Sequence, residues 1–524
     1  MAVPNPDSSH KLDHVVVIMF ENRSFDNVLG SLYQYGEKPS FEGVLGRNLS
    51  NPIPSGVPGS EKRIVPVHEA LNMDTPDPDP GEEHPHINTQ LYGTVAPPDN
   101  QLKPIDEMLP PFNAPTDPSA EPTMDGFVRD YINAFQTEMG RPPTYDEYAQ
   151  IMAYYTPDQL PVIATLAKGF ACFDHWFCEV PSQTYCNRSF IHAASSSGKV
   201  NNSPVGKFEA ENDAPTIFER LEDAGKSWRI YIDPEQLVPA TALIHARRLM
   251  PRFADRFRTI FDFYHDAKEG ELPTYSFIEP NMLHPHTDMH PPGSCRLRHE
   301  LHIKASNAML GGEQLLAKVY EAVRDGEQFG EGRSNWANTL LLVTFDEHGG
   351  TYDHVPPPRV PPPTTPTGKE EEGFRFDRSG VRVPAIAISA WVDEGTVVNE
   401  EYRHTSVIQT LRKRWVLGAP LTQRDAVAKD IAPILNRATP RPRDQWPQVT
   451  PRRLSILDEV EEEIFRPLGC LENNIVGEAL SHEAHANSTS PAGDLEKMGV
   501  KGARMHLKRI RDEMFPGIAN GRVS

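Results

Sequence analysis

The sequence predicts an α/β fold, with a mostly parallel sheet, helices on both of its faces and long loop insertions. Short apolar runs recur along the chain, and amphipathic stretches of helical length separate them, which is the alternation typical of parallel sheets. In addition, proline-rich excursions interrupt this alternation and indicate long ordered loops. The apolar runs occupy residues 15–20, 227–232, 273–279, 339–345 and 382–389.

The first run, VVVIMF at residues 15–20, is apolar at every position, which favours a strand buried on both faces. A helix is expected over 214–225, directly before the run at 227–232. Another is expected over 312–326, before the run at 339–345. This second helix has apolar residues at helical spacing, so one side of it should face the core. The apolar residues are Leu315, Leu316, Val319 and Val323.

Four segments lie outside this alternation. Residues 50–122 are rich in Pro, Asp, Asn and Gly and are expected to form a long insertion after the first strand. Residues 354–373 form a second proline-rich excursion. Residues 436–453 are expected to be a linker, and residues 454–524 a helical C-terminal appendage. The domain that carries the sheet is therefore expected to span residues 1–435.

Composition argues against several classes of function. The chain has 52 Lys and Arg against 73 Asp and Glu, a net charge of −21, which disfavours binding to nucleic acid and docking on anionic membranes. No stretch has the length of a membrane span, and the N-terminus lacks the features of a secretory signal. A cytoplasmic or otherwise soluble protein is expected, with secretion as the open alternative. The five cysteines have no metal-ligand spacing, so free thiols are expected.

Polar residues follow two of the predicted strands. Glu21 and Asn22 come directly after the first strand, and Asp346 and Glu347 come directly after the strand at 339–345. Buried carboxylates that meet at one edge of a sheet repel each other, and a bound divalent cation would remove that cost. All four side chains offer oxygen ligands, which suit a hard ion such as Mg²⁺, Ca²⁺ or Mn²⁺. Two glycines after the second pair would let the main chain approach the site.

The segment EVPSQTYCNRSFIHAASSSG, residues 179–198, contains candidate nucleophiles. Ser182, Thr184 or Ser189 could attack as a hydroxyl activated by a divalent cation. Arg188 could bind phosphate oxygens. The alternative is an ordinary turn followed by a helix N-cap.

Histidines supply a third group of candidates. Several lie in loops, and one group lies beside an aspartate after the strand that ends at residue 279. Such histidines can bind phosphate or metal or act as general acids, although isolated ones are usually surface or core residues. The residues of interest are His84, His86, His284, His286, Asp288, His290 and His404.

These stretches, in this order, resemble the bacterial phosphoesterase family that holds phospholipases C and related acid phosphatases, a branch of the alkaline phosphatase superfamily. The resemblance runs from near the N-terminus to about residue 425. The matching stretches are HVVVIMFENRSFDN (14–27), MDGF (124–127), YYTPDQLPVIATLAKGFACFDHWFCEVPSQTYCNRSF (154–190), SFIEP (276–280), DMHPP (288–292), TFDEHGGTYDHV (344–355), VRVPAIAIS (381–389) and RHTSV (403–407).

The resemblance implies an alkaline-phosphatase-like sheet and metal-assisted hydrolysis of a phosphoester. Thr184 matches the family's hydroxyl nucleophile and would also bind the metal. The metal ligands implied are Glu21, Asn22, Thr184, Asp346 and Glu347, and the ion would be Ca²⁺, Mg²⁺, Mn²⁺ or Zn²⁺. Further catalytic roles are implied for His290 and His404. The substrate-binding residues implied are Asn22, Arg188, His84, His86 and Asp288.

One position departs from the family pattern, because Cys186 stands where many members have proline after the nucleophile. The chemistry should survive this change, and the substrate class becomes less certain. The expected function is that of a phospholipase C-type hydrolase, which cleaves a phosphodiester such as a phospholipid headgroup through a phosphothreonine. The alternatives are an acid phosphatase acting on monoesters and a metal-binding protein without catalysis. No nucleic-acid partner is expected, and the oligomeric state is left open.

Overall fold

The computed structural model describes residues 11–202, 206–236, 238–283, 286–293, 307–326, 333–365, 368, 370–453 and 500–522. Its strands in the main sheet are β1 (His14–Phe20), β6 (Ala171–Phe173), β8 (Trp228–Ile232), β9 (Phe257–Thr259), β10 (Tyr275–Glu279), β11 (Thr339–Phe345), β12 (Ala385–Ile388) and β13 (Thr396–Val398). Three further pairs lie outside it: β2 (Ser50–Pro52) with β3 (Ile64–Pro66), β4 (His68–Glu69) with β5 (Ala153–Tyr154), and β7 (Trp176–Phe177) with β14 (Tyr402–Arg403).

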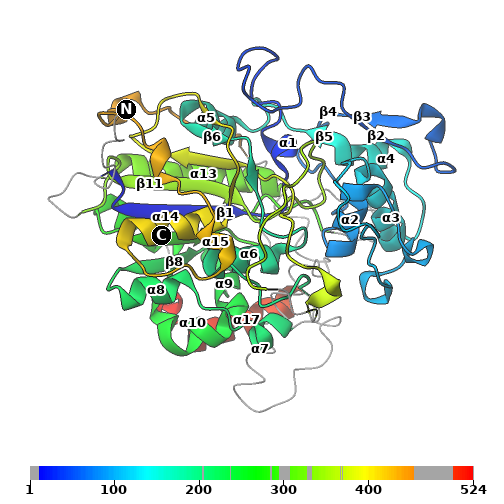
Figure 1. Cartoon of the computed structure of the whole chain (residues 1–524). Coiled ribbons are helices and arrows are strands. Elements are labelled where there is room, and N and C mark those ends of the chain that lie inside the picture. Colours follow the sequence, from blue (N-terminus) through cyan, green and yellow to red (C-terminus); the bar gives the residue numbers. More distant parts are fainter. Residues whose placement is uncertain are drawn as a thin grey trace.

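The main sheet has eight strands in the order β13-β6-β12-β11-β1-β10-β8-β9 (Figure 1). All neighbouring strands are parallel except at β12, which runs antiparallel to both β11 and β6. The predicted α/β fold with a mostly parallel sheet is therefore confirmed. Since β1 lies near the middle of the sheet between β10 and β11, the carboxyl ends of these three strands meet at one edge.

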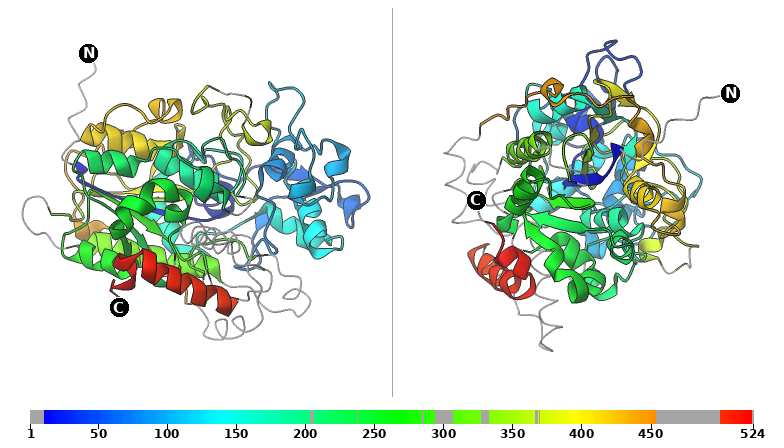
Figure 2. Two further views of the ribbon diagram at one scale, coloured as in Figure 1. Left: turned by 90° about the horizontal axis from the view of Figure 1, so that it is seen from below. Right: turned by 90° about the vertical axis from the view of Figure 1, so that its left-hand side faces the viewer.

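Helices cover both faces of the sheet. One face carries α5, α11 and α13, and the other carries α6, α8 and α14 (Figures 1 and 2). The helix bounds are α1 (Phe25–Val28), α2 (His84–Tyr92), α3 (Phe127–Met139), α4 (Tyr145–Ala149), α5 (Pro161–Gly169), α6 (Thr184–Ala193), α7 (Lys207–Glu211), α8 (Ile217–Asp223), α9 (Ala240–Ile244), α10 (Ala246–Phe253), α11 (Ile260–Lys268), α13 (Ala308–Asp325), α14 (Thr405–Trp415), α15 (Gln423–Ala426), α17 (Val500–Met514) and α18 (Pro516–Ala519).

All five predicted runs contain a strand of the main sheet, namely β1, β8, β10, β11 and β12. The helices expected over 214–225 and 312–326 are α8 and α13. The run at 382–389 breaks the parallel arrangement, because its strand β12 runs antiparallel. Sequence patterning did not predict the short strands β6, β9 and β13.

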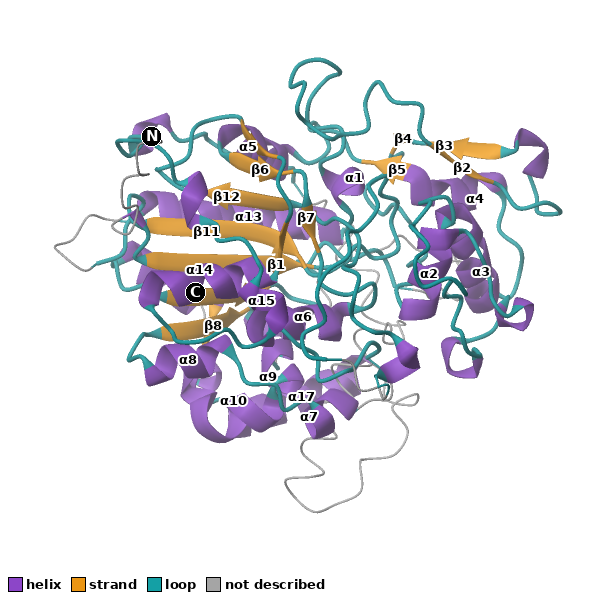
Figure 3. Cartoon of the chain, in the orientation of Figure 1, coloured by secondary structure: helices purple, strands orange, loops and turns teal. Residues whose placement is uncertain are grey.

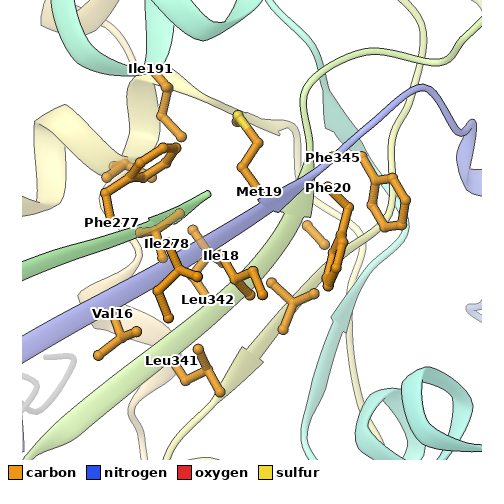
Figure 4. Close-up of a cluster of buried hydrophobic side chains, with 14 of the residues drawn as sticks. Val16, Ile18, Met19, Phe20, Ile191, Phe277, Ile278, Leu341, Leu342 and Phe345 are labelled. Atoms are coloured by element: carbon orange, nitrogen blue, oxygen red, sulfur yellow. The ribbon is translucent and has the colours of Figure 1, made fainter. Parts of the chain in front are cut away.

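The core is centred on β1, where every residue is buried. Its side chains alternate between the two faces of the sheet and contact neighbours from β10, β11 and α6 (Figure 4). Burying each large aliphatic side chain contributes about 1.5–3 kcal/mol. The labelled contacts are made by Val16, Ile18, Met19, Phe20, Ile191, Phe277, Ile278, Leu341, Leu342 and Phe345.

The insertion after the first strand has a hydrophobic core of its own. The hairpin of β2 and β3 lies beside α2, α3 and α4, at the right of Figure 3. Its helical part continues beyond the predicted boundary at residue 122, because α3 and α4 belong to the same cluster. Core residues here include Ile53, Val65, Ile87, Leu91, Phe127, Tyr131, Tyr148 and Met152.

The segment expected as a linker, residues 436–453, packs against the body that carries the sheet. Trp446 is buried, with its ring centroid 4.9 Å from that of Phe170, and Tyr320 donates to Pro447 O (2.8 Å). Of the expected appendage, the structure describes α17 and α18, and α18 lies beside β9. Residues 454–499 lie outside the described residues. None of the described helices is both long and apolar enough to cross a bilayer.

Candidate active site

Two neighbouring strands end side by side at one edge of the sheet. β1 and β11 pair with Phe20 opposite Phe345, so that Glu21 and Asp346 come next on the two chains. The main chain continues the pairing, since Asp346 N donates to Phe20 O (3.0 Å). Asn22 N then donates to Asp346 Oδ1 (3.0 Å). The prediction that the two strand ends bring their polar residues together is therefore confirmed.

The turn after β11 allows the two chains to approach closely. Asn22 has a φ of 53° and Gly349 a φ of 57°. A Cβ on Gly349 would lie 2.2 Å from Asn22 O, so glycine is required at this position. Gly349 N also donates to Glu347 Oε2 (2.7 Å) and orients that carboxylate. The expected role of this glycine, to let the main chain approach the site, is confirmed.

Thr184 begins α6 and faces the end of β1. Its Oγ1 donates to Glu21 Oε2 (3.2 Å), and both side chains are buried. The amino end of a helix carries partial positive charge and unpaired N–H groups, which favour a negatively charged ligand. Cys186, two residues on, is also buried, and its Sγ donates to Gln183 O (3.0 Å). The departure from the pattern of the family that the sequence resembles therefore lies in the first turn of α6 and not at the hydroxyl.

Arg188 follows Thr184 by one helical turn and pairs with Glu21. Its Nε donates to Glu21 Oε1 (2.7 Å), and its Nη2 donates to the same oxygen and to Met19 O (3.0 Å). Nε also lies 3.8 Å from Asp346 Oδ2. Nη1 has no hydrogen-bond partner among the described residues and is the atom left for a ligand. Arg188 thus offsets part of the carboxylate charge, and its role in substrate binding stays a prediction.

Several buried acceptors at this edge have no hydrogen-bond partner within the described ranges. They are Asn22 Oδ1, Asp346 Oδ2 and Glu347 Oε1. Burial and the neighbouring Asp346 raise the pKa of Glu347 well above its usual value. Buried acceptors without donors are costly unless a cation or ligand satisfies them. Together with Glu21 and Thr184, these oxygen donors fit a divalent ion.

Histidine and acidic groups also gather elsewhere. In the part of the chain that the structure describes, two sets have ligand atoms within 4.8 Å of one another, and the set Glu21, Asp346 and Glu347 is not one of them. The two sets are Asp26 with Asp353 and His354, and Asp79 with Glu82 and His290.

The second of these sets lies against Asn22. Asn22 Nδ2 donates to Glu82 and lies 2.9 Å from His290 Nε2. Gln183, directly before Thr184, donates from Nε2 to Glu82 Oε1 (3.3 Å). Burial and Glu347 raise the pKa of Glu82 well above its usual value. Sequence reasoning missed Glu82, and its only signal was the acidic run PDPDPGEEH in the insertion.

Asp288 links the loop after β10 to the end of β1. Its carbonyl oxygen accepts from Glu21 N (2.8 Å), and its Oδ1 accepts from His290 N (3.1 Å). Asp288 Oδ2 lies 3.0 Å from His286 Nδ1. Burial acts to raise the pKa of Asp288, but the two histidines hold it below its usual value. The structure thus brings Asp288 and His290 to the candidate site, while His284 lies outside the described residues.

The remaining predicted histidines make different contacts. His84 Nδ1 donates to Pro181 O (2.9 Å), shortly before α6 begins at Thr184. Burial lowers the pKa of His84 to about 4. His86 instead pairs with Asp130 of α3 (2.8 Å). His404 is buried with both nitrogens in use: Nδ1 accepts from Trp176 Nε1 (3.1 Å) and Nε2 donates to Asp346 O (2.7 Å). The catalytic and substrate-binding roles of these residues stay predictions.

Arg23, the residue after Asn22, donates mainly to main-chain carbonyl groups. Its Nε donates to Met289 O (2.8 Å) and its Nη1 to Thr75 O (2.6 Å). These hydrogen bonds connect the segment after β1 to the loops that contain Thr75 and Met289. They support a structural role for Arg23.

Comparison with known proteins places this chain in a family. A model of the Phosphoesterase family matches residues 12–418. Non-specific phospholipase C3 of Arabidopsis thaliana is 33% identical over 450 residues, which cover 83% of this chain and 75% of the relative. Phospholipase C A of Mycobacterium tuberculosis is 25% identical over 512 residues, covering 91% of this chain and 85% of the relative.

Among solved structures, a protein of the alkaline phosphatase superfamily from Vibrio parahaemolyticus has a TM-score of 0.32 and 12% identity, and the match covers 76% of this chain and 98% of that one. The family assignment depends on the sequence matches alone. The chain belongs to the Phosphoesterase family and is a phosphoric ester hydrolase.

Proposed function

We propose that the chain is a phospholipase C-type hydrolase, which cleaves a phosphodiester through a phosphothreonine at Thr184. The observation that carries the proposal is the Thr184 hydroxyl, which begins α6 and donates to Glu21 at the end of β1. A purely structural metal site would need no hydroxyl in this position. Relatives named phospholipase C match most of the chain, which supports a diester substrate over a monoester.

The proposed reaction has two displacements at phosphorus, the first by Thr184 and the second by water. Thr184 Oγ1 attacks phosphorus, the bond to the leaving alcohol breaks, and the hydroxyl proton passes to Glu21 while the alcohol takes a proton from solvent. Water then attacks phosphorus and loses a proton to solvent, the bond to Thr184 breaks as the Thr184 oxygen takes back its proton from Glu21, and a phosphomonoester leaves. The amino end of α6 faces the negative charge that develops on the phosphoryl oxygens.

A divalent cation would be held by Glu21, Asn22, Thr184, Asp346 and Glu347, and would lower the pKa of the attacking hydroxyl and offset phosphoryl charge. The unpartnered oxygens of Asn22, Asp346 and Glu347 support this assignment. His404 donates to the carbonyl of Asp346 and thereby fixes one of these ligands in place.

The nucleophile is tested by replacing Thr184. Thr184→Val removes the hydroxyl and should lower kcat by at least about 10³-fold, whereas Thr184→Ser keeps a hydroxyl and should retain measurable turnover. Acid quenching during turnover, followed by mass spectrometry, should find the phosphoryl group, still esterified to the alcohol that the diester retains, on the peptide that contains residue 184. A phosphorylated peptide elsewhere, or turnover by Thr184→Val close to that of the native enzyme, would refute the assignment.

Substrate class and metal dependence are tested together. Initial rates on p-nitrophenylphosphorylcholine and p-nitrophenyl phosphate should favour the diester. Chelation should abolish both rates, and one divalent ion should restore them. A preference for the monoester would move the enzyme to the acid phosphatase class, and full activity after exhaustive chelation would remove the metal from the proposal.

A further inference from the structure

Asn202 lies beside the first turn of α6, where the proposed nucleophile stands. Its main-chain N donates to Gln183 Oε1 (3.0 Å), and its side-chain Oδ1 accepts from Tyr185 N (3.0 Å). These two partners flank Thr184 in the sequence, and Asn202 is only 1% exposed. We propose that the Nδ2 amide group of this side chain donates to a non-bridging oxygen of the phosphoryl group that Thr184 attacks, which rests on the proposed function and adds a residue to it.

The orientation of the Asn202 carboxamide follows from its partner. A main-chain N–H can only donate, so the atom that faces Tyr185 N must be the oxygen. Nδ2 therefore occupies the other position of the carboxamide, and this buried nitrogen has no hydrogen-bond partner among the described residues. A buried donor without an acceptor is costly. A bound ligand with oxygen acceptors would remove that cost, and a phosphoryl group is such a ligand.

Other buried asparagines show that such an unpaired nitrogen is unusual in this protein. Asn187 Nδ2 donates to neighbouring main-chain carbonyl groups. Asn212 Nδ2 donates to Ser189 Oγ (3.0 Å) and to Ile244 O (2.9 Å). Within the described ranges, Asn202 Nδ2 is the one buried amide nitrogen of an asparagine or glutamine side chain that lacks a partner. The fold thus pairs its structural amide groups and leaves this one, beside the proposed nucleophile, for a ligand.

The unpartnered buried groups around Thr184 divide into acceptors and donors. The acceptors are the oxygens at the ends of β1 and β11 that would hold a cation. The donors come from the side of α6, where Arg188 has only Nη1 left after its bonds to Glu21 and Met19. Asn202 Nδ2 adds a second side-chain donor there. A phosphoryl group bound next to a cation needs these donors as well, because its non-bridging oxygens accept hydrogen bonds.

A neutral donor suits this position. Nδ2 and Oδ1 share one carbon atom, so the hydrogen bond from Tyr185 N to Oδ1 places Nδ2 at the amino end of α6. The partial positive charge of this helix end favours an anion at the same place. Because an amide carries no charge, it would not compete with a metal for Glu21 and the other carboxylates. A hydrogen bond from it strengthens as negative charge develops on the phosphoryl oxygens in the transition state.

The alternative is that Asn202 only caps α6 through Tyr185 N, and two substitutions separate the roles. Asn202→Ala removes both the acceptor and the donor. Asn202→Asp keeps an acceptor for Tyr185 N and replaces the donor by an anionic oxygen. If Nδ2 binds the phosphoryl group, Asn202→Asp should be the poorer variant, because its carboxylate repels that group. If Asn202 is only a cap, Asn202→Asp should be the better one, since a carboxylate suits the amino end of a helix.

Phosphate binding tests the role of Nδ2 without reference to turnover. Full-length protein loaded with Mn²⁺ is titrated with inorganic phosphate by calorimetry. Asn202→Ala should bind phosphate at least about tenfold more weakly than the native protein, and Asn202→Asp should bind it more weakly still. Lys199→Ala serves as the matched control, because Lys199 lies in the same segment and pairs with Glu211 at the surface. Its phosphate affinity should equal that of the native protein.

Kinetics and folding complete the test. With p-nitrophenylphosphorylcholine, kcat should fall at least about 10²-fold in Asn202→Ala and further in Asn202→Asp, while both variants stay folded by circular dichroism and bind Mn²⁺ as the native protein does. If Asn202→Asp does not fold, the result for Asn202→Ala decides alone.

An unchanged phosphate affinity in Asn202→Ala, a higher affinity in Asn202→Asp than in Asn202→Ala, or no phosphate binding by the native protein would overturn the role of Nδ2. Weaker phosphate binding in both variants, together with turnover by Thr184→Val, would refute the nucleophile and keep Asn202 as a phosphate-binding residue.

Discussion

At the scale of single residues, Asn187 holds the turn that carries the proposed nucleophile. Its Oδ1 accepts from the main-chain N–H groups of Glu179 and Val180 (both 2.9 Å). Its Nδ2 donates to Val180 O (3.1 Å) and Ser182 O (2.7 Å). One side chain thus satisfies four main-chain groups in a buried loop, and the position of Thr184 depends on that loop.

Replacing Asn187 by alanine should therefore destabilise the fold and slow the reaction. Two buried N–H groups would lose their acceptor, which costs at least about 2 kcal/mol in the free energy of unfolding. Urea denaturation measures this loss, and kcat should fall because the start of α6 shifts. Asn48→Ala, at an exposed position, serves as the control and should change neither quantity. An Asn187→Ala protein as stable as the native one would contradict this account.

The site residues that the sequence predicted lie at strand ends, whereas those that it did not predict come from a long insertion or from contacts between distant segments. Glu21 and Asp346 were predictable because each ends a strong apolar strand, and parallel strands bring their carboxyl ends together. Asp79 and Glu82 were not, because they reach the site through the fold of a long insertion, which no local pattern encodes. The pairing of Arg188 with Glu21 was missed for the same reason, since it joins residues far apart in the sequence.

At the scale of elements, α2 and α3 are joined by buried polar contacts that lead to the active edge. Gln90 Nε2 donates to Gly81 O (2.7 Å) and to Asp130 Oδ2 (2.8 Å), which fixes its amide orientation. Gln90 Oε1 must then accept from His348 Nε2 (2.8 Å). The other oxygen of Asp130, Oδ1, pairs with His86 Nδ1 (2.8 Å). The insertion thus sets the tautomer of His348, which is next to Glu347.

The pair of His86 and Asp130 should make stability depend on pH. Asp130 raises the pKa of His86 to about 9 against the opposing effect of burial, compared with about 6.5 in the unfolded chain. Because the folded value is the higher one, the stabilisation is complete below pH 6.5 and is lost as the pH rises through 9. Its size is up to about 3 kcal/mol, which urea denaturation at pH 6, 7.5 and 9 would measure.

His86→Gln removes the charge and should flatten this part of the pH profile. Thr137 provides the control, because it is an exposed residue of α3 in the same insertion and does not titrate. Thr137→Ala should therefore keep the native slope between pH 6.5 and 9. An unchanged slope in His86→Gln would assign the pH dependence to another group.

At the scale of the whole molecule, the sheet is assembled from strands far apart in the sequence. The five predicted strands were found because each lies in a mostly apolar run, and their alternation with helices indicated a parallel sheet. The strands β6, β9 and β13 have only three residues each, too few for a pattern to register. The antiparallel direction of β12 depends on how its connections cross the molecule, which local sequence does not specify.

The C-terminal helices cover the edge of this sheet at β9. Phe515, between α17 and α18, is buried with its ring centroid 5.2 Å from that of Phe257 in β9. Thr259, also in β9, donates from Oγ1 to Arg522 O (2.9 Å). We propose that this part of the appendage folds as one unit with the sheet, because an uncovered edge strand would expose Phe257 and its main-chain groups.

Phe515→Ala should then lower the free energy of unfolding of the whole molecule by about 3 kcal/mol, the usual cost of removing a buried aromatic ring. Urea denaturation followed by tryptophan fluorescence measures the effect, and hydrogen exchange of the β9 amides should accelerate together with that of the central strands. Glu513→Ala, at an exposed position of α17, should leave both unchanged. If Phe515→Ala instead produced a separate early transition, with the main one unaltered, the C-terminal helices would be an independent unit docked on β9.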